Sequence, residues 1–447
     1  MVRNGLLGRR SRLLAAAAAT GAALVVLAGC SAPGSSTASG SSQSASKDLG
    51  SDKITLSVLI DTPGVEGIKQ LGAAFHKAHP NVTISVTGEA FTDLDANAPR
   101  TLASAKVPDI MRVHVGTLVK DKLLTPLDDY SKLYGWNKWP QSQFQSERQN
   151  NAGTVRGEGP LWVIGNGYGL TGVYYNKKIL DQLGGGEPKT LDDFTALLKK
   201  AKDAGLSGIV TNGKDGGLAY PLQNLAIDYG TAGKISDWVF NKPGSSIDTP
   251  AMVKAAQTIQ DWSNDGYFVS DVNGLDTTTA PTEFAKGQSL FYTSGNWQAP
   301  GLNKSMPGNV GFMLFPSAKA SDPVYAMSAS ESLAIPAHAK NKNAAAAFLN
   351  FVQTDKKARQ ITVDHFGLAP AGPSGASTPT ADGVVADTLT AFGKAVSSNG
   401  LVDFLANSTS SMSQTITPET QLLATNRTTP DAFAQKLQSD YETQIKG

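Results

Sequence analysis

Apolar and polar positions alternate in short blocks along most of the chain. Residues 54–60 (ITLSVLI) and the alternating apolar positions of residues 82–86 each predict a strand. Between them, apolar residues recur at helical spacing at positions 68, 71, 75 and 78, and Pro80 ends that helix. This order of strand, helix and strand predicts two parallel strands joined by a crossover helix.

Helix boundaries are clearly marked further along the chain. Thr190 and Asp193 have the spacing of a capping box, and Gly205 ends the apolar stripe that follows them. Thr-Pro pairs at 249–250 and 429–430 predict two more helix starts. The sequence contains no internal repeat. Strands that alternate with helices in this way predict an α/β fold, with more than one sheet.

The first 30 residues have the pattern of an export signal. Four Arg and no acidic residue accompany an Ala-rich apolar run at 13–28, which is shorter and less apolar than a membrane-spanning helix. The run ends in Leu-Ala-Gly-Cys at 27–30, which resembles the bacterial lipobox, in which the cysteine is lipidated and becomes the new N-terminus. We therefore expect residues 1–29 to be a signal peptide and Cys30 to carry the lipid. An ordinary secretory signal with a chance cysteine is the alternative, and the Arg9-Arg10 pair leaves Sec or twin-arginine export open.

A serine-rich segment follows Cys30. Eight of the 16 residues at 31–46 are Ser, a composition typical of flexible linkers. We therefore expect residues 30–51 to tether a folded body to the outer face of a membrane. Cys30 is the only cysteine in the sequence, so its lipidation leaves no thiol for a disulfide, a metal ligand or a nucleophile.

The composition indicates a globular protein without a nucleic-acid partner. The 447 residues are 40% hydrophobic and 17% charged, which is enough apolar material for large cores. Four of the 39 basic residues lie in the first 29 positions, so the remainder carries 35 basic and 38 acidic residues. A nucleic-acid-binding protein would show a basic surplus instead.

Signatures of cofactor binding and catalysis are weak in this sequence. Residues 167–172 (GYGLTG) have the G-x-G-x-x-G spacing, but strand-like Val-Tyr-Tyr follows them, where a dinucleotide site needs a helix start. His76 and His79 have no acidic or cysteine partner at ligand spacing. We therefore expect no cofactor, no metal and no catalysis, although the two placed carboxylates of a glycosidase cannot be recognised from one sequence.

Four tryptophan residues indicate a carbohydrate ligand. Trp136, Trp139, Trp162 and Trp297 lie in segments rich in Gly, Pro or Asn, outside helical stripes. An indole ring on a rigid scaffold offers a flat apolar face to the C–H groups of a sugar ring. For any one of them, packing inside the fold is the alternative.

Four groups of sequence motifs occur in order between about residues 52 and 370. They are residues 75–84 (FHKAHPNVTI) with 107–110 (VPDI), residues 172–180 (GVYYNKKIL) with 187–194 (EPKTLDDF), residues 284–297 (FAKGQSLFYTSGNW), and residues 331–336 (ESLAIP) with 367–370 (GLAP). In this order they resemble the extracytoplasmic solute-binding proteins of ABC importers, in the carbohydrate-binding group that includes maltose-binding protein. The chain departs from the family pattern where Ser289-Leu290-Phe291 replaces the usual A-A-M.

The resemblance implies a two-lobe, Venus-flytrap fold with hinge crossings near residues 161–172, 315–330 and 370. The first lobe would contain residues 52–163 and 316–370, and the second lobe residues 164–315 and 371–447. The implied protein is a monomeric, lipid-anchored receptor on the outer face of the cell membrane, which captures a mono- or oligosaccharide and delivers it to the permease subunits of an ABC importer. A sugar-sensing lipoprotein for a membrane kinase and a secreted glycan-acting hydrolase are the alternatives.

Nine residues are the predicted ligand contacts. The resemblance places Trp297 against a sugar ring. Asp61 and Glu89 follow the first two predicted strands, where ligands of open α/β sheets bind, and their carboxylates can accept hydroxyl protons. The other candidates follow strands or lie in the predicted crossings, and they are His114, Trp162, Asn166, Tyr168, Asn296 and Glu331. For every candidate except Trp297, a structural role in a loop or cap is an equally good interpretation.

Overall fold

The computed structural model describes residues 44–447 except 374–375, 377–378, 410 and 447. The predicted signal peptide, Cys30 and most of the predicted tether lie outside these residues. Among the described helices, none is long and apolar enough to cross a membrane.

Most strands of the described residues belong to one mixed sheet. Its strands are β1 (Ile54–Asp61), β2 (Val82–Glu89), β3 (Ile110–Arg112), β6 (Val163–Asn176), β7 (Ser207–Val210), β8 (Ser289–Gly295), β9 (Val310–Met313), β10 (Ala326–Ala334) and β11 (Leu401–Val402). The strand order is β2-β1-β3-β10-β6-β8-β7, with β11 beside β10 and β9 beside β6. A separate hairpin contains β4 (Arg148–Gln149) and β5 (Arg156–Leu161).

The parallel pair predicted at the start of the chain is confirmed. β1 pairs in parallel with β2 along its whole length, and with β3 on its other side. The connecting helix α1 (Val65–Ala78) buries Ile68, Leu71 and Phe75 because these residues recur on one helical face. The carboxyl ends of these parallel strands therefore lie at one edge of the sheet.

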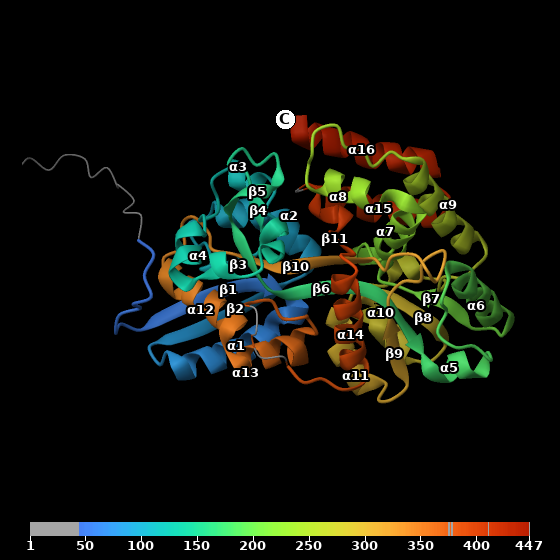
Figure 1. The fold of residues 1–447 in the computed structure, drawn as a ribbon, viewed down its shortest axis with the longest axis horizontal. Helices are drawn as coiled ribbons and strands as arrows, with labels where there is room; N and C mark the ends of the chain where they lie inside the picture. The colour runs from blue at the N-terminus through green and yellow to red at the C-terminus, as the bar shows by residue number, and fades with distance from the viewer. Residues whose placement is uncertain (1–43, 374–375, 377–378, 410, 447) are drawn as a thin grey trace, which may run out of the picture. The chain divides into compact units, whose positions relative to one another are not determined.

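The long strand β6 joins two groups of strands. Its residues 163–170 pair antiparallel with β10, and its residues 171–176 pair with β8 and β9. Figure 1 shows β6 passing from the group around β1 to the group around β8. Separate hydrophobic clusters lie in the two groups, one containing Phe75 and Phe348 and another containing Phe194 and Phe291.

We call β1–β3 with the helices packed on them the first lobe, and β7–β9 with theirs the second lobe. The residue boundaries given above for the lobes stay a prediction. The helices of the first lobe are α1, α2 (Phe91–Leu102), α3 (Thr117–Lys120), α4 (Asp128–Tyr134), α12 (Lys342–Thr354) and α13 (Lys356–Ile361). Those of the second lobe are α5 (Lys177–Gln182), α6 (Leu191–Asp203), α7 (Ala219–Ala226), α8 (Ala232–Val239), α9 (Pro250–Asn264), α10 (Thr279–Ala285), α11 (Ala299–Ser305), α14 (Gly383–Ser397), α15 (Met412–Ala424) and α16 (Pro430–Lys446).

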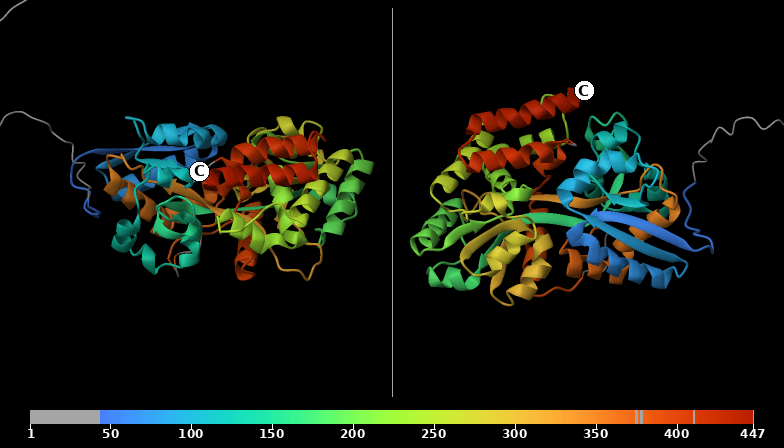
Figure 2. Two further views of the ribbon diagram at one scale, coloured as in Figure 1. Left: turned by 90° about the horizontal axis from the view of Figure 1, so that it is seen from above. Right: turned by 180° about the vertical axis from the view of Figure 1, so that it is seen from behind.

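Short 3-10 or π-helical turns connect these elements. They are η1 (Thr62–Gly64), η2 (Trp136–Lys138), η3 (Gln141–Glu147), η4 (Gly213–Asp215), η5 (Ile227–Thr231), η6 (Val272–Gly274), η7 (Asn296–Gln298), η8 (Thr362–Phe366) and η9 (Leu405–Asn407). Figure 2 shows α15 and α16 lying side by side on the second lobe, where they contact each other.

The predicted helix caps are also confirmed. The Thr190 hydroxyl accepts a hydrogen bond from the Asp193 backbone N–H, and the Asp193 carboxylate accepts one from the Thr190 N–H. At the start of α9, the Thr249 hydroxyl accepts from the Met252 N–H. Each cap satisfies backbone donors that the first helical turn leaves without partners.

Gly165 and Gly167, which were predicted to lie in a crossing between the lobes, lie within β6. A Cβ atom on Gly165 would lie 2.5 Å from the Cβ of Ser330, and one on Gly167 would lie 2.8 Å from the Cβ of Leu368. Glycine at these positions therefore lets neighbouring segments pack directly against the strand. Residues 167–172 form part of this strand, as the strand-like Val-Tyr-Tyr predicts, and do not open a helix.

Candidate ligand-binding site

A charged cluster lies where β1 and β3 end. The Arg112 Nη1 is 2.5 Å from Asp61 Oδ1 and 3.0 Å from Glu331 Oε1. Asp61 and Arg112 are the last residues of two parallel strands, and Glu331 comes from β10, which pairs with β3. The two carboxylate side chains are 10% and 11% exposed, and the arginine side chain is 22% exposed. The cluster is therefore reached by solvent mainly through Arg112.

An irregularity in the β6–β10 pairing brings Asn166 to this cluster. Ser330 pairs with Tyr168 and Ser332 with Gly165, so β6 has one more residue than β10 across this step. Such a bulge changes the direction of local side chains. Asn166 lies in the bulge, is 2% exposed, and is close enough to Glu331 to lower its pKa.

Three buried polar atoms of this site have no hydrogen-bond partner at good geometry among the described residues, although the Asn166 side chain lies near enough to Glu331 to lower its pKa. They are Oδ1 and Nδ2 of Asn166 and Oε2 of Glu331. Buried polar groups in folded proteins are nearly always hydrogen-bonded, because an unpaired one retains its full desolvation cost. Unpaired atoms grouped in this way mark a position where a polar ligand would be stabilised.

Burial and ion pairing set the charges of the cluster. Burial alone would lower the pKa of Arg112, but Asp61 and Glu331 raise it above its usual range, so the guanidinium stays charged. Burial raises the pKa of Glu331 to about 7, although the Arg112 charge opposes this shift.

Neighbouring side chains connect the cluster to the second lobe. The Phe91 ring lies 4.6 Å from the Arg112 guanidinium carbon and packs edge-on against the His114 ring. His114 Nδ1 is 3.1 Å from Asp95 Oδ1, and the Ser413 hydroxyl of α15 donates to Asp95 Oδ2 at 2.8 Å. Burial alone would raise the pKa of Asp95, but His114 and Ser413 lower it overall.

Two aromatic side chains of the second lobe form a partly exposed pair. Trp297 in η7 and Tyr220 in α7 meet edge to face, with ring centroids 5.9 Å apart. The indole lies directly against Gly295, where an added Cβ would be 2.0 Å from the ring. Burial raises the pKa of Tyr220 to about 12, and the positive charge of Arg112 opposes that shift.

Other predicted contacts are bonded within the protein framework. The Trp162 indole N–H donates to the Gln149 carbonyl at 2.8 Å, and the Tyr168 hydroxyl donates to the Gln143 carbonyl at 3.0 Å. Asn296 accepts from the Leu170 N–H and donates to the Tyr168 carbonyl. Glu89 lies opposite Asp61 at the end of β2 and is half-buried. The structure thus groups Asp61, Asn166 and Glu331, with His114 nearby, and ligand contact by all nine residues stays a prediction.

For Trp136 and Trp139 the structure favours the alternative interpretation, which is packing inside the fold. Trp136 is fully buried, Trp139 is 7% exposed, and both belong to the hydrophobic cluster of the first lobe. Trp136 stacks on Tyr134, and Trp139 stacks on Phe144. Their Gly- and Pro-rich surroundings are the short turns that let the chain fold these rings inward.

Four side chains of the candidate site were not among the predicted ligand contacts, and they are Arg112, Phe91, Asp95 and Tyr220. For Arg112 a signal was present, because a charged residue directly follows the buried Ile110-Met111 pair at the end of a strand. Tyr220 and Asp95 gave no such signal, since each lies inside a helix and not at the end of a strand.

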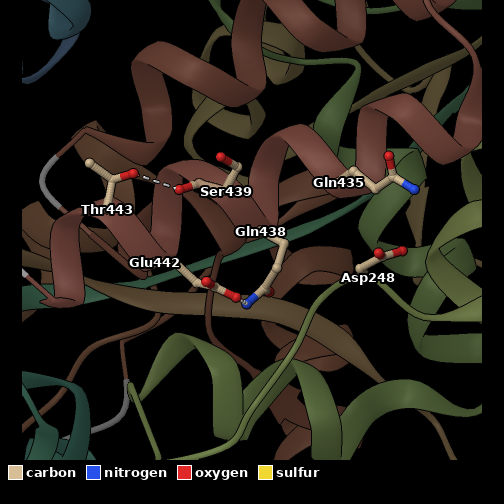
Figure 3. Close-up of a pocket in the computed structure, with 6 residues that line it drawn as sticks. All are labelled: Asp248, Gln435, Gln438, Ser439, Glu442 and Thr443. Carbon is tan, nitrogen blue, oxygen red and sulfur yellow. Dashed lines mark hydrogen bonds between the residues drawn. The ribbon is translucent and has the colours of Figure 1, made fainter.

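The surface also has a hollow along α16, with a volume of about 440 Å³. Figure 3 shows its lining residues, which are Asp248, Gln435, Gln438, Ser439, Glu442 and Thr443. Two pairs of these residues bond to each other, through the hydrogen bonds from Gln438 Nε2 to Glu442 Oε1 at 3.0 Å and from the Thr443 hydroxyl to the Ser439 carbonyl at 2.8 Å. None of these residues belongs to the charged cluster. Within the described part of the chain, no group of three His, Cys, Asp or Glu side chains could hold a metal ion.

Comparison with protein families gives one match across two thirds of the chain. Residues 61–359 match the family described as bacterial extracellular solute-binding protein. A multiple sugar-binding protein of Streptococcus mutans serotype c is 21% identical over 316 residues, which are 68% of this chain and 72% of that protein. A galactooligosaccharide-binding protein of Bacillus subtilis (strain 168) is 24% identical over 335 residues, which are 72% of this chain and 74% of that protein.

Solved structures share the two-lobe fold. A chitin oligosaccharide binding protein superposes with a TM-score of 0.72 at 19% identity, over 89% of this chain and 100% of that one. A protein studied for xylan utilisation by the thermophile Caldanaerobius polysaccharolyticus superposes with a TM-score of 0.74 at 21% identity, over 86% of this chain and 99% of that one. The predicted α/β, two-lobe fold class is therefore confirmed.

Proposed function

The chain belongs to the bacterial extracellular solute-binding protein family, and from that membership we propose that it is the lipid-anchored receptor of an ABC importer for a carbohydrate. It captures a mono- or oligosaccharide between its lobes and delivers the sugar to a membrane permease. Several of its relatives and structural neighbours carry sugar-binding names, which supports this ligand class.

One observation of the site carries the proposal. Buried oxygen and nitrogen atoms of Asn166 and Glu331 lie beside the Arg112 ion pairs of the first lobe, and the partly exposed Tyr220–Trp297 pair belongs to the second lobe. Sugars need this combination, because their hydroxyl groups require buried hydrogen-bonding atoms and their C–H faces require an aromatic surface.

The same arrangement explains how binding would close the lobes. A ligand that touches the polar cluster and the aromatic pair at once has more contacts in the closed form than in the open form. The difference in contacts shifts the population toward the closed form, and no other source of free energy is needed. The closed form then docks on the permease, and the tether beginning at Cys30 keeps the receptor close to it.

A glycan-acting hydrolase is the less favoured alternative. Such an enzyme uses one carboxyl group as an acid and a second as a nucleophile or base. Here Asp61 and Glu331 both contact the same nitrogen of Arg112, which holds the two carboxylates against a cation. Product analysis after incubation with oligosaccharides separates a binder from a hydrolase, and a pair of permease genes beside this gene separates an importer from a sensor.

A thermal-shift screen against mono- and oligosaccharides tests the proposed function. A sugar that binds only the folded protein, at a concentration about 100 times its Kd, adds about 2.7 kcal/mol to the free energy of unfolding. The screen covers glucose, galactose, maltotriose, raffinose, xylotriose and chitotriose, with glycerol at the same hydroxyl concentration as a control. If no sugar stabilises the protein more than glycerol does, the proposal is wrong.

A further inference from the structure

The last residues of the predicted tether lie against the body of the protein. Residues 44–51, which we call the strap, precede β1, and Figure 1 shows this part of the chain beside α4 and α12 of the first lobe. Ala45 and Leu49 of the strap are half-buried and pack against the hydrophobic cluster of the first lobe. Burial of two apolar side chains favours the docked position of the strap over a free one.

Asn343 of α12 holds the strap through its side-chain amide. Its Nδ2 donates to the Ser44 carbonyl at 3.3 Å, and its Oδ1 accepts from the Ser46 backbone N–H at 3.2 Å. The two bonds flank Ala45, much as a neighbouring strand would pair with it. Oδ1 also accepts from the Tyr130 hydroxyl of α4 at 2.7 Å. Asn343 is 8% exposed among apolar neighbours on its helix, so the strap supplies partners that a buried amide requires.

Further contacts fasten the middle and the end of the strap. Lys47 Nζ lies 5.4 Å from the centroid of the Tyr134 ring of α4, within the range of a cation–π interaction. At the end of the strap, the Asn81 side-chain amide donates to the Gly50 carbonyl at 3.0 Å. These partners come from α4, α12 and the loop before β2, which all belong to the first lobe.

We propose that residues 44–51 act as an intramolecular strap that fixes the lipid tether to the first lobe. The inference rests on the proposed function in one respect, the lipid at Cys30. With the strap docked, residues 31–43 connect the lipid to the body and span at most about 45 Å. With the strap released, residues 31–51 would span at most about 70 Å. The strap therefore limits how far the first lobe lies from the lipid, and it leaves the second lobe free to move on the hinge.

Cleavage by endoproteinase Lys-C tests the docking, because Lys47 is the only lysine that precedes Lys53. A protease needs the strap to open locally, so the cleavage rate follows the population of the open form when opening is fast. The purified, detergent-solubilised protein is compared with a synthetic peptide of residues 41–53, and mass spectrometry identifies the cleaved bond. We expect cleavage after Lys47 to be at least about a hundredfold slower in the protein than in the peptide.

Three variants test which contacts hold the strap. Asn343→Ala removes both of its hydrogen bonds to the strap and should speed cleavage after Lys47 about thirtyfold. Leu49→Ala changes the strap and not the body, and it should speed cleavage about tenfold. Asn350→Ala is the matched control, since Asn350 lies on the same helix but accepts from the Trp136 indole N–H at 3.0 Å. Its cleavage rate should stay within about threefold of the wild type.

The outcomes separate this inference from the proposed function. Wild-type protein cleaved as fast as the peptide would overturn the strap. So would Asn343→Ala and Leu49→Ala cleaved no faster than Asn350→Ala. Melting temperatures are measured beside the rates, and faster cleavage of Asn343→Ala with a lowered melting temperature, without faster cleavage of Leu49→Ala, would also overturn it. A slow, strap-dependent cleavage that releases a fragment without lipid on Cys30 would support the docking and contradict the proposed lipid anchor alone.

Discussion

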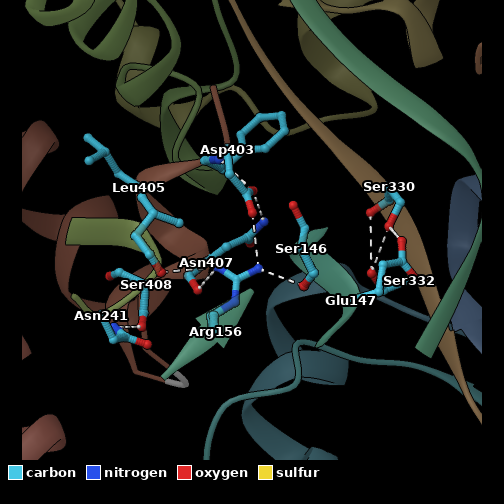
Figure 4. Close-up of polar contacts among 12 residues, drawn as sticks. Ser146, Glu147, Arg156, Asn241, Ser330, Ser332, Asp403, Leu405, Asn407 and Ser408 are labelled. Carbon is cyan, nitrogen blue, oxygen red and sulfur yellow. Dashed lines mark hydrogen bonds and ion pairs between the residues drawn. The ribbon is translucent and has the colours of Figure 1, made fainter. Parts of the chain in front are cut away.

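The substitution Arg156→Met removes a buried cation that connects β5 to η3 and to the segment that contains Asp403 and η9. Figure 4 shows the Arg156 guanidinium pointing at the Asp403 carboxylate, with Nη2 3.0 Å from Oδ2. The same group donates to the Ser146 carbonyl of η3 at 3.1 Å and to the Asn407 carbonyl of η9 at 2.7 Å. The ionic side chains of Arg156 and Asp403 are only 7% and 2% exposed.

The expected loss of stability follows from what the substitution leaves behind. Methionine fills much of the arginine volume but leaves the Asp403 charge without its cation, and loss of one partner of a buried ion pair costs about 3–5 kcal/mol. Asp403 keeps hydrogen bonds from the Phe404 N–H and the Asn407 side-chain amide, both at 2.7 Å, which offset part of that cost. We expect the free energy of unfolding to fall by about 3 kcal/mol.

Equilibrium urea unfolding of the purified protein, followed by tryptophan fluorescence and circular dichroism, measures this loss. The midpoint should fall while the m-value stays constant, since the exposed surface on unfolding is unchanged. Arg148→Met is the matched control, because Arg148 pairs with the 41% exposed Asp128 at 3.4 Å and should lose less than about 1 kcal/mol. A loss as small in Arg156→Met as in this control would refute the reasoning.

Three further substitutions test other parts of the account. Burial raises the pKa of Glu147 to about 8, so the folded state keeps a proton that the unfolded state loses above pH 4.5, and stability should fall as pH rises from about 5 to 8. Glu147→Gln should make that decline shallower by up to about 1.4 kcal/mol per pH unit in urea unfolding, and the contribution of Glu331 should remain. Thr190→Ala removes the capping box of α6 and should cost about 1 kcal/mol by the same assay, and a loss near zero would contradict the cap. Cys30→Ser should move the protein from the membrane fraction to the medium, as cell fractionation would show, whereas retention at the membrane would argue against lipidation.

Local signals in the sequence were sufficient to predict several strands and helix starts of the fold. The strand at 54–60 and the caps at Thr190 and Thr249 were predictable because backbone donors, helical period and side-chain alternation act over a few residues. Arg156 and Asp403 could not be paired in advance, since 247 residues separate them and nothing in either neighbourhood specifies the other. The Glu147–Ser330 contact in Figure 4 is a similar case.

The candidate site was predictable only in part. Asp61 and Glu331 were placed by their positions at or near strand ends, but their common partner Arg112 was not, because strand register decides which ends meet. Asn166 was predicted to lie in a crossing between the lobes. Its burial could not be predicted, because it depends on a bulge in the β6–β10 pairing that no sequence pattern indicates. Trp136 and Trp139 share the Gly- and Pro-rich setting of Trp297, yet pack in the core, because local composition does not determine burial.

Trp297 provides the most direct test of the central claim that a sugar binds between the polar cluster and the aromatic pair. The measurement is the Kd, by calorimetric titration, of the sugar that most stabilises the protein in the screen, for the wild type, Trp297→Phe and Trp297→Ala. Loss of the partly exposed indole should weaken binding about thirtyfold or more, while Trp297→Phe retains most of the affinity and the ligand-free melting temperature stays nearly constant in both variants. Unchanged affinity in a well-folded Trp297→Ala, or collapse of its ligand-free stability, would contradict the account.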